Sequence, residues 1–163
     1  MTIQSIGIVA LALFATAHVS RGAELRVSNV LENSAALNGK IVQVRGYIQS
    51  GFETFAIADT PTGQGLWIQY PERVSPGPGY RVSKDREFWK MIKGLPEWRG
   101  HGGCRTVQAI LTGRIDAVET AGLIRDSSGK IVEVKGFGHL NLYRVQLVLQ
   151  KVSAVMIEKK SCE

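Results

Sequence analysis

The sequence lacks the residue patterns that mark the common hydrolases, zinc proteins and disulfide scaffolds. It contains no GxSxG, no HExxH and no phosphate-binding glycine loop, and its 163 residues include only two cysteines and three histidines. A chain of this length buries a substantial core without help from disulfides. These features argue against an enzyme, although they do not exclude one, and they predict a single globular domain.

Charge is missing from the N-terminus. No charged side chain precedes Arg21, and Ile6 to Val19 is almost wholly apolar. This run is too short for a spanning helix, and small residues follow it, so it predicts a signal peptide over residues 1–22. Cleavage is expected after Ala17 to Gly22. We therefore expect a periplasmic or secreted protein whose mature chain has no transmembrane segment. A buried N-terminal helix is the alternative.

The few cysteines and histidines leave two questions open. Export would place Cys104 and Cys162 in an oxidising compartment, where a disulfide between them and two free thiols are equal alternatives. His101, Cys104 and His139 are weak candidates for a metal site. HxxC is half of a zinc-like set, but the sequence has no second close pair, and structural zinc usually has four ligands. No cofactor is expected.

Two period-two apolar runs each carry a late glycine. Gly39 to Ile48 (GKIVQVRGYI) contains Gly46, and Val107 to Ile115 (VQAILTGRI) contains Gly113. Glycine lets a strand bend or bulge, which is how a small sheet curls into a barrel. The two runs therefore indicate two bent strands of one sheet.

The remaining periodicity predicts a short helix, a three-stranded meander, an irregular insert and two long strands. The helix is expected from about Ser28 to Leu37, with Ser28 or Asn29 as its cap. The insert covers residues 71–105 and contains a short helix from Arg86 to Lys93. Residues 119–133 are expected to form a loop or hairpin, and 136–142 a turn. The expected strands are Lys40–Ser50, Phe52–Asp59, Leu66–Tyr70, Thr106–Val118 and Tyr143–Val155.

This order predicts a mainly β domain over residues 23–163. Five strands with bent first and fourth members are the plan of a five-stranded OB-like Greek-key barrel, here with a short N-terminal helix and an insert between strands three and four. A small open sandwich is the alternative.

Several segments resemble a group of short exported bacterial proteins that are described as OB-fold-like and of unknown function. They are LNGKIVQVRGYI, SGFETFAIAD, LWIQYP and GHLNLYRVQLVLQKV. The resemblance covers roughly Val27 to Tyr70 and Thr106 to Val155, and it leaves out the insert. It implies the fold and brings no catalytic residues to this chain.

A ligand-binding face is expected on the outer surface of the barrel. OB barrels bind ligands across strands two and three and the neighbouring loops. The candidate residues there are Arg45, Tyr47, Trp67, Gln69 and Arg114. Arginine and aromatic side chains suit single-stranded nucleic acid, but an exported protein meets little of it. In the alternative, Tyr47 and Trp67 pack under the insert and the arginines are solvated.

The insert is the second candidate for a binding surface. It carries eight basic and four acidic residues, and thus four of the six net positive charges, together with Trp89 and Trp98. Such a segment suits an anionic component of the cell envelope or a partner protein. In the alternative, its aromatic residues close one end of the barrel and its charges face water.

The sequence therefore predicts an exported, non-catalytic binding or interaction module of the cell envelope. A nucleic-acid or nucleotide binder of OB type is the first alternative, and a metal-dependent hydrolase is the second. The hydrolase alternative rests on His101, Cys104 and His139. The acids near strands that a nuclease could use are Glu53, Asp59 and Asp116, and they form no recognisable pattern.

Overall fold

The structure is a computed structural model that describes residues 23–51, 53–70, 81–95 and 105–159. The predicted signal peptide, Trp98, His101 and both cysteines lie outside the described residues. The prediction of a mainly β protein is confirmed. No helix in the described part of the chain is long and apolar enough to cross a membrane.

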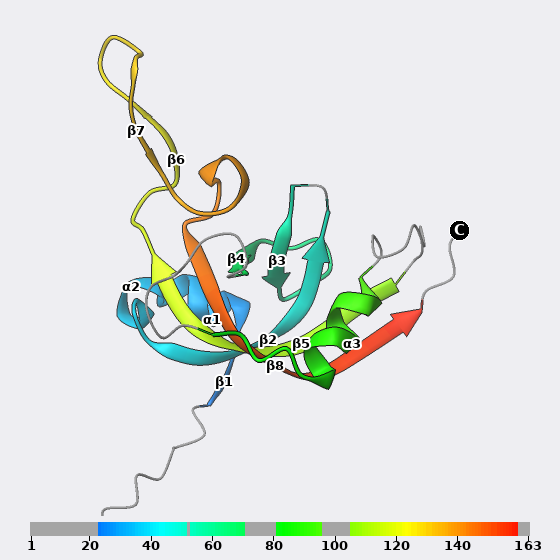
Figure 1. Cartoon of the computed structure of the whole chain (residues 1–163). Helices are drawn as coiled ribbons and strands as arrows, with labels where there is room; N and C mark the ends of the chain where they lie inside the picture. The colour runs from blue at the N-terminus through cyan, green and yellow to red at the C-terminus, as the bar shows by residue number, and fades with distance from the viewer. Residues whose placement is uncertain (1–22, 52, 71–80, 96–104, 160–163) are drawn as a thin grey trace, which may run out of the picture.

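The main sheet is mixed and has six strands in the order β1-β2-β3-β4-β8-β5 (Figure 1). β1–β2 and β4–β8 are parallel pairs, whereas β2–β3, β3–β4 and β5–β8 are antiparallel. β2 also pairs with β5, so the pairing that runs from β2 through β3, β4, β8 and β5 returns to β2. The strands are β1 (Glu24–Arg26), β2 (Ile41–Ser50), β3 (Phe55–Ala58), β4 (Gly65–Gln69), β5 (Arg105–Ala117) and β8 (Val145–Lys159).

The period-two pattern is confirmed in β2 and β5, whose alternate residues are buried, including Val44 and Leu111. In β8 the strict alternation fails, because Val148 is buried as well as Leu147 and Leu149. The two strand glycines sit where neighbouring strands approach closely. A Cβ atom at Gly46 would lie 2.5 Å from the carbonyl oxygen of Ala58, and one at Gly113 would lie 2.5 Å from that of Val148. The β5–β8 register also shifts between Thr112 and Gly113, as expected for a bulge at a strand glycine.

The predicted N-terminal helix is wrong in its continuity and in its cap. It is broken at Asn33 into α1 (Val27–Glu32) and α2 (Ser34–Leu37). Neither Ser28 nor Asn29 caps it, because α1 already begins at Val27. The first backbone N–H groups, those of Val27 and Ser28, instead donate to the carboxylate of Asp59, at 2.8 and 2.9 Å. Because Asp59 follows β3, this bond fixes α1 against the sheet.

The insert helix α3 (Arg86–Gly94) matches its prediction to within a residue and packs along the far ends of β5 and β8 (Figure 1). Asp85 caps it by accepting from the N–H of Phe88 at 3.1 Å. Phe88 and Met91 are fully buried in the main core, as are Val27 and Val30 of α1. The two helices therefore supply side chains to the same core as the strands.

The bounds of β3 and β8 differ from the prediction by more than one residue. β3 is shorter because Gly51 and Thr54 bond reciprocally in a turn, with N–O distances of 2.8 and 3.3 Å. β8 begins at Val145, since Tyr143 instead forms an isolated bridge with Phe137, and it runs on to Lys159. The parallel edge strand β1 was not predicted.

A separate two-stranded hairpin lies between β5 and β8. It consists of β6 (Gly122–Arg125) and β7 (Ile131–Lys135), and it projects away from the main sheet (Figure 1). It lies within the predicted loop or hairpin, except that β7 ends two residues later than predicted. The 3₁₀ helix η2 (His139–Asn141) follows β7, where the sequence predicts a turn.

Candidate ligand-binding site

Two of the predicted site residues line one cavity. Gln69 from β4 and Arg114 from β5 contribute to a cavity of about 300 Å³ on the outer face of the main sheet. Asp116 of β5 and Gln146 of β8 complete its polar side, and the loop after β7 forms the opposite wall with Gly136, Phe137, Gly138 and Asn141. We call this the outer-face cavity.

The polar side of the outer-face cavity is a connected hydrogen-bond network. Arg114 binds Asp116 through both ends of its fork, with Nε–Oδ1 2.7 Å and Nη2–Oδ2 3.0 Å. Gln146 Nε2 donates to Asp116 Oδ2 at 3.1 Å. The geometry follows from the strands, because Arg114 and Asp116 are two residues apart on one face of β5, and Asp116 pairs with Gln146 across to β8. The side chains of the ion pair are 35% and 25% exposed, so they are only partly screened by water.

Trp67 supports the wall of this cavity. Its ring lies 5.5 Å from that of Tyr143, centroid to centroid, and its indole Nε1 donates to Gln69 Oε1 at 3.4 Å. A Cβ atom at Gly138 would lie only 2.5 Å from Cε3 of Trp67. The ring is therefore covered by the backbone of the loop after β7.

The loop over the cavity has an unusual backbone. Gly136 and Gly138 have φ values of 116° and 74°, and Leu140 and Asn141 have φ values of 53° and 55°. Left-handed conformations of residues other than glycine are uncommon, and they tend to gather at functional sites. Reciprocal backbone bonds between Phe137 and Tyr143, at 2.8 and 3.2 Å, close the loop.

A second contact ties this loop to the turn after β2. His139 Nε2 lies 3.2 Å from Glu53 Oε1. His139 was a weak metal candidate, but no group of three or more potential metal ligands occurs in the part of the chain that the structure describes. The other two candidate ligands, His101 and Cys104, lie outside that part, so the metal site stays a prediction.

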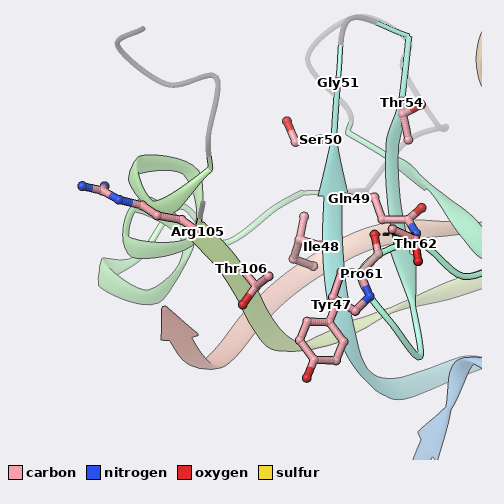
Figure 2. Close-up of a pocket in the computed structure, with 10 residues that line it drawn as sticks. All are labelled: Tyr47, Ile48, Gln49, Ser50, Gly51, Thr54, Pro61, Thr62, Arg105 and Thr106. Carbon is pink, nitrogen blue, oxygen red and sulfur yellow. Dashed lines mark hydrogen bonds between the residues drawn. The ribbon is translucent and has the colours of Figure 1, made fainter. Parts of the chain in front are cut away.

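Tyr47 belongs to another cavity, of about 380 Å³, beside β2 (Figure 2). Its lining includes Gln49, Thr62 and Thr106, and Arg105 stands at its far end with its side chain directed away from Tyr47 (Figure 2). Gln49 Nε2 donates to the carbonyl oxygens of Pro61 and Gly63, at 3.2 and 2.8 Å. This bond holds the loop between β3 and β4 against the outer surface of β2.

Arg45 has a structural partner. Its guanidinium forms an ion pair with Glu24 of β1, including an Nη2–Oε2 contact of 3.1 Å. The hydrogen bond from Arg45 lowers the pKa of Glu24 below its ordinary value, against a smaller opposing effect of burial. Arg45 therefore joins β1 to β2, and it lines a recess of about 210 Å³ with Arg26, Tyr47 and Asp59.

The structure thus divides the predicted binding residues among three places. Gln69 and Arg114 meet at the outer-face cavity, with Trp67 behind its wall. Arg45 and Tyr47 lie on the outer side of β2. Trp89 lies on α3, where it is 41% exposed.

The sequence did not single out Gln146 or the glycines at 136 and 138 as site residues, and it named Asp116 only among the acids that an enzyme could use. An outward-facing Arg-x-Asp on β5 and an outward glutamine on β8 were visible signals. Their meeting depends on the register between two strands that are about thirty residues apart, as in the bond between Asp116 and Gln146.

The outer-face cavity offers matched donors and acceptors. It presents a guanidinium and a carboxylate whose charges cancel, three residues with side-chain amides, and backbone groups next to glycines. Such a set suits a small ligand with several hydroxyl groups, because each hydroxyl both donates and accepts hydrogen bonds.

Comparisons with known proteins give no match to this chain among protein families, curated proteins or solved structures. The resemblance to exported OB-fold-like proteins therefore stays a prediction, and the function must be argued from the site.

Proposed function

We propose that the main sheet is an OB-like Greek-key barrel. The return of the pairing from β5 to β2 supports closure, and the single parallel pair within this circuit, β4–β8, supports the Greek-key order. The barrel would be the single domain of residues 23–163, exported by the N-terminal segment 1–22. In such a barrel the loop between the fourth and fifth barrel strands borders the ligand site. Here these strands are β5 and β8, and their connection carries the β6–β7 hairpin and the loop over the outer-face cavity.

We infer that the protein is a non-catalytic binding module that holds a small uncharged, hydroxyl-rich ligand, such as one sugar unit of an envelope polysaccharide. The observation that carries this proposal is the charge-balanced network of Arg114, Asp116 and Gln146 beside Gln69. A volume of about 300 Å³ suits a ligand of that size. OB barrels are also known to take oligosaccharides.

Calorimetric titration of the mature protein with neutral and acidic oligosaccharides tests this function. Gln146→Leu removes an amide from the cavity, and the loss of one hydrogen bond is expected to weaken binding about 5- to 10-fold. Gln43→Leu is the matched control, because Gln43 is also a half-buried glutamine on the outer face of the sheet. It lies on β2, opposite Thr112 of β5, and does not line the outer-face cavity. Equal losses in both variants, or no saccharide binding by the wild type, would contradict the proposal.

A nucleic-acid binder of OB type is the second candidate. The cavity beside β2 favours it, because Tyr47 lines this cavity, Arg105 stands at its far end, and the chain has a net charge of +6. Binding to labelled single strands should then weaken steeply as salt rises, and it should fall when Tyr47 is replaced by alanine. Absence of binding at low salt would eliminate this candidate.

A further inference from the structure

We propose that the outer side of α3 docks on the surface of an anionic lipid bilayer. Its residues are separate from the outer-face cavity, so this proposal does not depend on the ligand bound there. The argument rests on which side chains α3 exposes, how firmly it is held, and what lies beside it.

The exposed side of α3 carries cations and one tryptophan. Arg86, Trp89, Lys90 and Lys93 are all exposed, and the 3.6-residue period places them on one side of the helix. The two acids near the start of the helix are engaged elsewhere, since Asp85 caps α3 and Glu87 accepts from the backbone N–H of Val155 at 2.9 Å. Glu87 Oε2 also lies 4.0 Å from Lys90 Nζ, so within the described residues the positive charge that has no acidic partner on the outward side comes from Arg86 and Lys93. We call the four exposed residues the α3 stripe.

The helix that carries the α3 stripe is anchored in the core. Phe88 and Met91 anchor the opposite side of the helix in the main core, and the ring of Phe88 contacts Trp89 edge-on at 5.2 Å. Lys90 Nζ donates to the carbonyl oxygen of Val155 at 2.6 Å, so this cation also fastens the helix to β8. Arg86 and Lys93 form no ion pair within the described residues.

Further cations lie at the C-terminal end of α3. Gly94 packs against Val107 and Ile157, which pair with each other across β5 and β8. Two residues further out along both strands, Arg105 pairs with Lys159. Ile157 is 37% exposed, so an apolar side chain also lies next to these charges.

A bilayer fits this surface better than a soluble ligand does. Ligands such as sugars and nucleotides bind in concave sites, whereas an exposed helix is convex. Tryptophan is favoured at the headgroup level of membranes, where an apolar ring with one polar N–H is stabilised, and lysine and arginine are attracted by anionic headgroups. The exposed part of Trp89 among cations matches that combination.

Vesicle sedimentation with the mature protein tests the proposal. We expect binding to phosphatidylcholine vesicles that contain phosphatidylglycerol, weaker binding at high salt, and little binding to pure phosphatidylcholine. The double substitution Arg86→Gln with Lys93→Gln should lower partitioning roughly 20- to 30-fold, since each cation near an anionic leaflet contributes about fivefold. Lys40→Gln with Lys130→Gln is the control of equal net charge, at exposed positions outside α3.

A second measurement distinguishes docking from attraction by net charge alone. Brominated lipid should quench the tryptophan fluorescence of the wild type, and Trp89→Phe should remove most of that quenching. The proposal is overturned if the control pair reduces binding as much as the α3 pair, or if quenching persists in Trp89→Phe. It is likewise overturned if the protein binds soluble anionic polysaccharide but not anionic vesicles.

Discussion

Glycine 138 is the residue on which the outer-face cavity depends most directly. Its φ of 74° is left-handed, and its Cα lies against the ring of Trp67 so closely that no side chain fits between them. The loop can therefore cover the outer surface of β4 only if this position has no Cβ atom. Trp67, which the sequence suggested as a ligand contact, serves here as the support of the loop.

The substitution Gly138→Ala tests this dependence. It should lower the free energy of unfolding by about 2–4 kcal/mol, because it adds a steric clash to the cost of a left-handed alanine. Gly129→Ala is the control, since Gly129 has a φ of 84° but open space around its Cα. That variant should lose only about 1–2 kcal/mol, or less if the loss stays within the hairpin. Denaturant titration of both variants measures the difference, and equal losses would contradict the role given to Trp67.

At the scale of elements, the contact between α1 and the end of β3 shows that a residue distant in the sequence can cap the start of a helix. Asp59 accepts from two N–H groups of a helix that begins 32 residues earlier in the chain. Burial alone would raise the pKa of Asp59, but the hydrogen bonds from Ser28 and Val27 and the charge of Arg26 outweigh it. The pKa therefore lies below its ordinary value.

This lowered pKa predicts how stability depends on pH. A carboxyl group with a lowered folded-state pKa stabilises the protein above its unfolded-state pKa of about 4, and the effect is lost as pH falls through the folded-state pKa. Asp59→Ala should lower the free energy of unfolding by about 1–2 kcal/mol at neutral pH. The difference in the free energy of unfolding between Asp59→Ala and the wild type should become smaller as the pH falls below about 4. Thermal unfolding across that pH range measures it, with exposed Glu32→Gln as control; a difference that is constant with pH would contradict the prediction.

The same elements show what could be predicted from the sequence. The strands β2 and β5 were predicted to within a residue at each end, because the alternation of apolar residues is a local property of the sequence. The existence of β8 was predicted for the same reason, but both of its ends differ from the prediction. The break at Asn33, the cap by Asp59 and the bridge between Phe137 and Tyr143 were not predicted, because each depends on a tertiary partner or on loop geometry. Gln69 and Arg114 were identified as candidate residues from the sequence. That they share one cavity with Gln146 was not predicted, because it depends on the pairing of distant strands.

At the scale of the whole molecule, the β6–β7 hairpin stands apart from the main core. Leu123, Val132 and Val134 are each about half exposed on it. Its strands pair with each other and not with the main sheet. A two-stranded hairpin of this kind adds little to the stability of the rest of the molecule.

We therefore expect the main sheet to fold without this hairpin. Gly136 lies against Ala121, so residues 122–135 can be replaced by a short glycine-containing turn between them. The shortened protein should unfold cooperatively, with a midpoint within a few degrees of the wild type. Circular dichroism on heating measures this. Loss of the cooperative transition would mean that the hairpin belongs to the core unit. The same variant shows whether the hairpin contributes to saccharide binding.

Val155 donates its backbone N–H to Glu87 and accepts from Lys90 Nζ, and these bonds have a consequence for the behaviour of this protein at high concentration. Together with the bond from the Ser83 N–H to the Gln150 carbonyl oxygen, at 2.8 Å, they occupy backbone groups of β8 beyond the point where β4 ends. Open strand edges of this kind template the stacking of further chains. The insert thereby covers this edge of β8 and protects it from pairing with another chain, and loss of these bonds would expose it.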